Sequence, residues 1–248
     1  MAERRFHLGW FMNFTPDEWR EPFGQGGMPW DGQFYIEMAK TLERACFDYI
    51  MIEDKLMVSD VYGGSMEAGL RTGMMAPKHD PVPLAVAMGM ATSRLGVVAT
   101  MSTLGYPPFL MARLSSTIDS LTKGRFGWNI VTSAENLAAR NFGLDKLPPR
   151  DLRYEMADEY MEVMGKLFES WDADAVVLDR EAGIYADYKR VHPIRHEGIS
   201  SRCAARLTPF ARRRAGRFTF RPAPRPAAGI SRRAMPIPSS PSPAAWPV

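Results

Sequence analysis

Polar side chains stand near the ends of apolar segments in this chain, where they could hold a polar ligand. Asn129 interrupts the apolar run Phe126–Val131, and Thr132 and Ser133 follow that run directly. A buried amide without a hydrogen-bond partner costs about 1–3 kcal/mol, so this group needs neighbours or a ligand to satisfy it. The segment therefore fits a strand that carries ligand-binding groups. A core asparagine satisfied by its neighbours is the alternative.

The same pattern occurs at two earlier apolar segments. The run YIMI at 49–52 is followed by Glu53 and Asp54, and the run at 95–103 carries Thr100 and Thr103 in its C-terminal part. Adjacent strand residues point to opposite faces, so we do not expect Glu53 and Asp54 to act as an acid–base pair. These residues predict one polar edge formed by the ends of several strands.

The order of elements predicts how these residues come together. We expect strands at 6–13, 49–52, 95–103 and 126–131, and helices at 31–46, 81–94, 107–121, 134–142 and 151–171. Strands that are apolar on both faces and alternate with helices are typical of a parallel sheet covered by helices. A doubly wound sheet and a (β/α)₈ TIM barrel both fit this order. No G-x-G-x-x-G follows the first strand, which favours the barrel.

Helix boundaries and buried faces follow from local signals. Asp31 is a plausible N-cap, and residues Phe34, Met38, Leu42 and Cys46 recur every four positions as a core-facing stripe. The helix at 107–121 is expected to end at the Lys123–Gly124 pair, with Gly124 as a left-handed cap. The last helix is expected to bury an inward face made of Ala157, Tyr160, Met161, Met164, Leu167, Phe168 and Trp171.

Composition indicates a soluble globular protein with an unusual C-terminal segment. The chain has 248 residues, of which 46% are hydrophobic and 24% are charged. No apolar run approaches the roughly 18–20 residues that cross a bilayer, so we expect no membrane segment. Two cysteines are too few for a disulfide framework, which favours the cytoplasm. The long stretch 55–80 is expected to be a functional or irregular excursion.

The chain changes character at residue 199. Residues 199–248 contain ten arginines and nine prolines, and no lysine, aspartate or glutamate, so the net charge of +3 comes from this segment. We expect residues 1–198 to form the folded part and 199–248 to be disordered. An arginine-rich tail could bind nucleic acid or an anionic membrane, but no recognisable module supports this, and we expect neither partner.

His192 and His196 are separated by three residues in the sequence HPIRH. Pro193 breaks the helical spacing that would place two histidines on one face. We therefore expect no metal site.

Several long segments resemble one family. They are FMNF, IEDK, STLGYPPFLMARLSSTIDSLTKGR, GRFGWNIVTSAENLAARNFG, RYEMADEYMEVMGKLFESW and HPIRHEG, in this order along the chain. They resemble the bacterial-luciferase-like flavin monooxygenases, in the branch of nitrilotriacetate and dibenzothiophene-sulfone monooxygenases. The resemblance spans roughly residues 5–198.

The resemblance implies a partial (β/α)₈ barrel, with about the first four βα units present. It also implies a two-component monooxygenase that takes reduced FMN (FMNH₂) from a separate NAD(P)H:flavin reductase. With dioxygen, such an enzyme oxygenates a nitrogen, sulfur or carbon centre of a small organic substrate. A homo-oligomer is implied as well. The tail resembles translation in a shifted reading frame, so we expect the second half of the barrel to be lost.

The resemblance also assigns cofactor-binding roles. It places Asp54 near the isoalloxazine ring, and Thr100, Thr103 and Asn129 at the polar edge of that ring. The hydroxyl of Tyr154 is implied to reach the FMN phosphate. Arg150 stands where the family usually has a histidine, and an arginine can pair with a phosphate. The resemblance assigns no catalytic residue. A non-catalytic truncated fragment, or a flavin-binding partner subunit, is the alternative function.

Overall fold

A parallel sheet forms the centre of the molecule. The structure, a computed structural model, describes residues 6–13 and 31–208 and the backbone of 219–220. The sheet has five strands in the order β1-β2-β3-β4-β9, and every neighbouring pair is parallel. The strands are β1 (Gly9–Met12), β2 (Tyr49–Ile52), β3 (Gly96–Ser102), β4 (Phe126–Val131) and β9 (Thr219–Phe220). The order of the described strands follows the chain without reversal, whereas the strand order of a doubly wound sheet reverses at its switch point.

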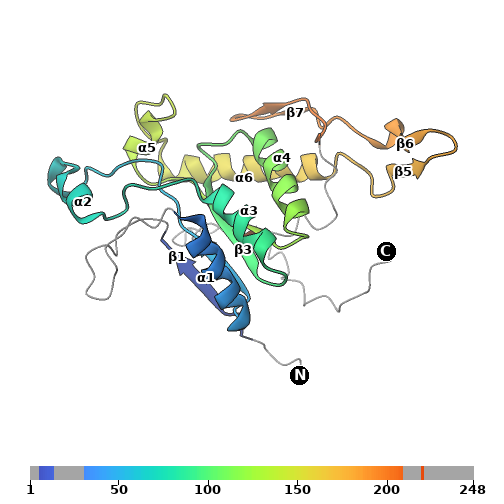
Figure 1. The fold of residues 1–248 in the computed structure, drawn as a ribbon. Coiled ribbons are helices and arrows are strands. Elements are labelled where there is room, and N and C mark those ends of the chain that lie inside the picture. Colours follow the sequence, from blue (N-terminus) through green and yellow to red (C-terminus); the bar gives the residue numbers. More distant parts are fainter. Residues whose placement is uncertain (1–5, 14–30, 209–218, 221–248) are drawn as a thin grey trace, which may run out of the picture.

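Helices pack against this sheet and enclose the core. They are α1 (Gly32–Arg44), α3 (Pro81–Ala91), α4 (Pro108–Leu121) and α6 (Arg150–Phe168). Figure 1 shows α1 and α3 side by side in front of the sheet, with α4 in front of α6. The core lies between the sheet and these helices, and its fully buried members include Ile50, Ile52, Met88, Met101, Met111, Ile118, Met164 and Leu167. The expected α/β organisation is confirmed.

Helix starts and ends follow the expected signals. The carboxylate of Asp31 accepts a hydrogen bond from the backbone N–H of Gln33 at 2.9 Å and caps α1. Asp80 caps α3 in the same way through Val82 at 2.8 Å. The turn after α4 has φ values of 54° and 81° at Lys123 and Gly124, a left-handed turn that stops the helix.

The buried stripe of α1 differs from the expectation. Phe34 is 55% exposed, and the helix ends at Arg44, so Cys46 lies beyond it and is exposed. Leu42 of the expected stripe is buried and Met38 is partly buried, whereas Tyr35 and Ala39 complete the buried face. A period of 3.6 residues drifts from a strict four-residue repeat, so the two ends of such a stripe turn away from the core.

The long helix α6 buries most of its expected face. Ala157, Tyr160, Met164 and Leu167 are buried, and Val163 joins them. Met161 and Phe168 pack partly buried against the core. Trp171 lies past the helix end, where its indole N–H donates to the carbonyl of Leu207 at 2.8 Å.

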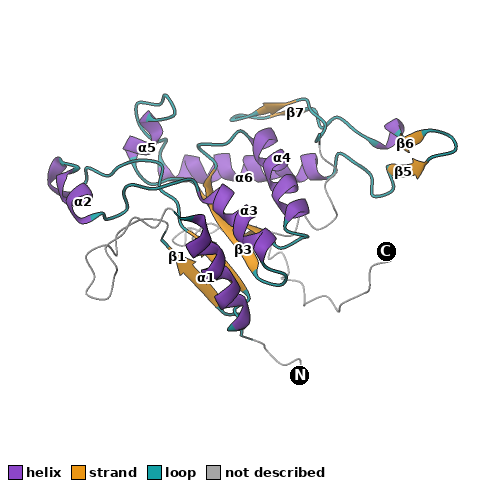
Figure 2. Ribbon diagram, in the orientation of Figure 1, coloured by secondary structure: helices purple, strands orange, loops and turns teal. Residues whose placement is uncertain are grey.

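Smaller elements lie outside the sheet (Figure 2). The excursion at 55–80 contains η1 (Tyr62–Gly64) and α2 (Glu67–Thr72), and α5 (Asn136–Arg140) follows β4. After α6 come an antiparallel hairpin of β5 (Val176–Asp179) and β6 (Ile184–Ala186), the turn η2 (Tyr188–Arg190), and a second hairpin of β7 (His196–Glu197) and β8 (Arg202–Cys203). No helix of the described part of the chain is long and apolar enough to cross a membrane.

The segment beyond residue 198 departs from the expected disorder at two places. Residues 199–208 include β8 and the fully buried Leu207, and residues 219–220 form β9 beside β4. Leu207 packs in the core, and this contact offsets the ordering cost that composition alone predicted to be too high. The rest of the expected tail lies outside the described residues.

The strand register sets which side chains share a face. Thr100 lies opposite Asn129, and Val98 opposite Gly127, on the face turned away from the helix-packed core. Because parallel strands end at one edge, the residues after β2, β3 and β4 gather there.

Candidate functional site

A cavity of about 310 Å³ lies at the carboxyl edge of the sheet. Its walls are the loop after β2 (residues 53–57), the end of β4 and its loop (130–135), and single residues of β3, α5 and α6. The walls combine apolar side chains with the carboxyl, hydroxyl and phenol groups of Asp54, Ser133 and Tyr154. This is the mixture expected of a site that binds a small molecule with both apolar and polar groups.

Asp54 lines this cavity, as expected for a residue that follows β2. Burial raises the pKa of its carboxyl to about 6, and the negative charge of Asp80 adds to this effect. The N–H of Lys55 bonds the carboxyl and opposes the rise. Asp54 therefore keeps its proton to a higher pH than an ordinary aspartate does, and raised pKa values of this kind are concentrated at functional sites.

Asp80, whose charge helps to raise the pKa of Asp54, belongs to a hydrogen-bonded network with Tyr106 and Tyr160. The hydroxyl of Tyr106 donates to Asp80 at 3.2 Å, and the hydroxyl of Tyr160 donates to the carbonyl of Tyr106 at 2.7 Å. Burial, and then the charge of Asp80, raise the pKa of Tyr106 to about 12. Asp80 thus accepts two hydrogen bonds, one from Tyr106 and one, at its other oxygen, from the backbone N–H of Val82 at the start of α3.

Thr100 and Asn129 pair with each other. The side-chain amide of Asn129 donates to the hydroxyl of Thr100 at 2.9 Å, across neighbouring strands. Neither residue is among those that line the cavity, and Thr103 is not either. The backbone N–H of Thr103 bonds the carbonyl of Val131 at 3.0 Å. The structure therefore places these three next to the cavity rather than in its wall.

Tyr154 and Arg150 lie one turn apart at the start of α6. Tyr154 lines the cavity, while Arg150 is exposed and its guanidinium lies over the Tyr154 ring, 5.9 Å from the ring centroid. The helix periodicity accounts for this contact, because residues four apart share a face. The two residues therefore share one face of α6, but only the phenol of Tyr154 belongs to the cavity wall.

Ser102 and Ser133 are site residues that the assignment by family resemblance omitted. Both line the cavity, and their hydroxyl oxygens lie 2.7 Å apart. Ser133 has φ = 60°, a backbone conformation that costs energy for a residue with a side chain and is concentrated at functional sites. The polar run after β4 already pointed to Ser133, whereas Ser102 reads as an ordinary buried strand residue.

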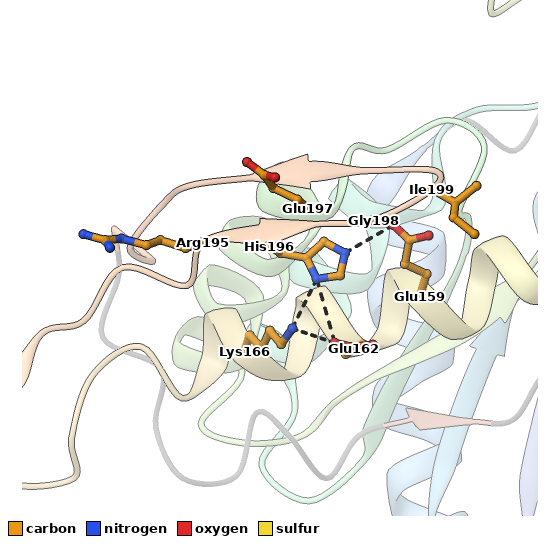
Figure 3. A pocket seen from close by; sticks show the side chains of 8 residues that line it. All are labelled: Glu159, Glu162, Lys166, Arg195, His196, Glu197, Gly198 and Ile199. Carbon is orange, nitrogen blue, oxygen red and sulfur yellow. Dashed lines mark hydrogen bonds and ion pairs between the residues drawn. The ribbon is translucent and has the colours of Figure 1, made fainter.

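A second, larger and more open cavity of about 590 Å³ lies between α6 and the β7–β8 hairpin. Figure 3 shows His196 between side chains of α6. Its Nε2 lies 3.2 Å from Oε1 of Glu159, and its Nδ1 lies 3.2 Å from Nζ of Lys166. His196 is only 7% exposed. These contacts form a network that joins β7 of the hairpin to α6.

Glu159 is the centre of that network. It also accepts hydrogen bonds from the backbone N–H groups of Ser200 and Ser201. Burial alone would raise the pKa of Glu159, but these bonds and the one with His196 outweigh burial and lower the pKa to about 2. Glu159 is therefore ionised at any ordinary pH and acts as a structural anchor.

The two histidines of the HPIRH segment have separate carboxylate partners. His192 faces Asp172 at 3.3 Å, whereas His196 faces Glu159. Within residues 6–13 and 31–208, no group of three or more His, Cys, Asp or Glu side chains could hold a metal ion.

Comparisons with known proteins identify the family. Residues 7–211 match the luciferase-like monooxygenases. The chain belongs to this family. This confirms the resemblance expected from the sequence. The dimethyl-sulfide monooxygenase of Hyphomicrobium sulfonivorans is 46% identical over 181 residues, which are 73% of this chain and 38% of that protein. The dibenzothiophene-sulfone monooxygenase of Rhodococcus erythropolis is 42% identical over 168 residues, which are 67% and 37% of the two chains.

A solved structure supports the same placement within the luciferase-like fold. Riboflavin lyase RcaE, solved with modified FMN and riboflavin, superposes with a TM-score of 0.77 and 33% identity. The match covers 83% of this chain and 47% of that one. The luciferase-like chain described here thus spans well under half the length of the two relatives above.

Proposed function

We propose that this chain is an FMNH₂-dependent, two-component monooxygenase that uses dioxygen to oxygenate a small organic substrate. Its sheet would be the first part of a (β/α)₈ barrel. The observation that carries the proposal is the cavity at the carboxyl edge of the parallel sheet, lined by Asp54, Ser133 and Tyr154 in a luciferase-like chain. Ligands of such folds bind at this edge of the sheet.

The cavity fits a flavin by the chemistry of its walls. Leu56, Met57, Ile130 and Val131 offer apolar surface to the faces of a tricyclic ring. Asp54 and the Ser133 hydroxyl offer hydrogen-bonding groups to its polar edge. A flavin needs both kinds of contact, because its ring is flat and apolar but carries carbonyl and imide groups.

The six residues assigned by family resemblance keep distinct roles in this proposal. Asp54 would bond the ring, and Tyr154 with Arg150 would bind the phosphate. Thr100 and Asn129, paired with each other, would hold β3 and β4 in register beneath the ring, with Thr103 at the end of β3. When bound, reduced FMN would supply the two electrons that activate dioxygen. The protein's own part is to orient the ring, exclude water and hold a proton on Asp54.

The relatives suggest the substrate class. Two of them are named for organosulfur compounds, a sulfide and a sulfone. A sulfide and a sulfone are both uncharged molecules. We therefore propose a neutral sulfur compound as substrate, a flavin reductase as partner in the cytoplasm, and a homo-oligomeric enzyme.

The test combines binding with turnover. FMNH₂ is titrated into the protein without oxygen, and reductase, NADH, air and dimethyl sulfide or dibenzothiophene sulfone are then added. The proposal requires saturable binding and an oxygenated product that disappears in Asp54→Ala. Saturable binding without product would favour the flavin-binding partner subunit, and absence of binding would overturn the proposal.

A further inference from the structure

The two residues beside Asp54 are each held by an ion pair to a different segment of the chain. Glu53 pairs with Lys78, which precedes α3, and both side chains are largely buried. On the other side, Nζ of Lys55 lies 3.2 Å from Oε1 of Glu135, which precedes α5. The Asp54 backbone is therefore fixed in both directions along the chain.

The Lys55–Glu135 pair is one of three contacts between the same two segments. The side-chain amide of Asn141 donates to the carbonyl of Leu56 at 2.7 Å, and the hydroxyl of Ser59 lies 3.5 Å from Glu135. All three contacts join the loop after β2 to the segment 135–141, which begins just before α5 and ends just after it. Both segments contribute residues to the wall of the 310 Å³ cavity.

Partial burial makes the loss of one partner of this pair more costly than at an ordinary surface ion pair. The side chains of Lys55 and Glu135 are 28% and 27% exposed. A partly desolvated pair is screened less by water, and removing one partner leaves the other charge partly buried and uncompensated. Because both charges line the cavity, such a change would also disturb the walls that a ligand contacts.

We propose that the Lys55–Glu135 ion pair is a latch that holds the two cavity walls together and so positions Asp54 toward the bound flavin. This inference rests on the proposed function. Lys55 and Glu135 are positioning residues in this account, since they act on the flavin through the walls. Direct contact of either charge with the flavin is the competing explanation.

A charge swap separates the two explanations. The double variant Lys55→Glu with Glu135→Lys exchanges the two charges. It keeps the ion pair between the walls but reverses the sign of any charge that contacts the flavin directly. The readouts are FMN affinity, from quenching of flavin fluorescence at pH 8 where Asp54 stays ionised, and hydrogen exchange of segments 53–59 and 132–137. Lys40→Glu on α1 is the matched control, because Lys40 pairs with Glu37 at 2.9 Å outside the cavity.

We expect each single reversal to weaken FMN binding about fivefold or more and to speed exchange in both segments. The swap is expected to restore affinity to within about twofold of wild type. Lys40→Glu is expected to change neither readout. Melting temperatures of all variants show whether a single reversal simply unfolds the protein, in which case the swap must restore both folding and affinity.

Three results would overturn the latch. In the first, single reversals leave exchange and affinity unchanged. In the second, the swap restores slow exchange but not affinity, which assigns the charges to direct flavin contact. In the third, the swap restores neither. Failure of the proposed function looks different: the wild type would not bind FMN saturably, while the swap would still restore slow exchange.

Discussion

Asn129 and Thr100 are joined by a hydrogen bond of 2.9 Å across β4 and β3, on the face of the sheet turned away from the helix-packed core. The amide that first suggested a ligand site is therefore satisfied at least partly by a neighbour. The pair fixes the register of the two central strands next to the cavity. The pair therefore affects the site by positioning the backbones of the two strands, since neither side chain belongs to the cavity wall.

Thr100→Val tests this role. The change keeps the shape of the side chain but leaves the amide of Asn129 without its partner, so we expect a loss of about 1 kcal/mol in the free energy of unfolding. Thr100→Ser keeps the hydroxyl and serves as the control. Urea denaturation measures both, and a Thr100→Val variant as stable as wild type would contradict the assignment.

Asp54→Asn tests the raised pKa of Asp54. Its folded-state pKa, about 6, lies above the ordinary value of 3.8, so folding favours the protonated form and the ionised form costs stability. The cost is absent below about pH 4. It grows as the pH rises from about 4 to about 6, between the unfolded and folded pKa values, and is constant at higher pH. We expect Asp54→Asn to be more stable than wild type by roughly 1–3 kcal/mol at pH 8.

The matched measurement is a pH series of thermal melts for both proteins. At pH 3 the two are expected to melt alike, since Asp54 is then neutral in both states. A difference that is constant from pH 3 to 8 would show that the asparagine acts through packing instead.

Glu159→Gln tests the anchor between α6 and the β7–β8 hairpin. The pKa of Glu159 is lowered to about 2, so its contribution is present above its ordinary pKa of 4.5 and is lost as pH falls through 2. Losing charge-assisted bonds to Ser200 and Ser201 is expected to cost about 1–3 kcal/mol at pH 7. Glu155→Gln, at an exposed position on the same helix, is the control. Equal effects of the two changes would argue against a special role for Glu159.

Tyr154→Phe tests the phosphate assignment. Loss of one hydroxyl that bonds a phosphate is expected to weaken FMN binding about tenfold. Binding of riboflavin, which has no phosphate, is expected to stay within about twofold of wild type. Fluorescence titrations with the two flavins make the comparison, and an equal loss for both would place Tyr154 at the ring rather than at the phosphate.

Much of the fold followed from the sequence because its signals are local. The cap at Asp31, the glycine stop at Gly124 and the continuous apolar strands each depend on a few neighbouring residues. The burial of Leu207 could not be predicted from the sequence, because it depends on contacts with elements far away in the chain. Composition alone could not detect that contact.

The site was predictable only in part for a similar reason. Strand ends identified Asp54 and Ser133, since parallel strands bring such positions to one edge. The sequence could not tell that Thr100 and Asn129 bond each other, because that depends on register. Nor could it show that Lys55 meets Glu135, since the two are brought together by loops whose path the sequence does not specify.

The most direct test of the central proposal is an oxygen-free titration of the wild-type chain with FMNH₂, followed by flavin fluorescence. The account predicts saturable binding with one site per chain, weakened by Asp54→Ala and by Tyr154→Phe but not by Lys40→Glu. Binding that never saturates, or that all three variants leave unchanged, would contradict it.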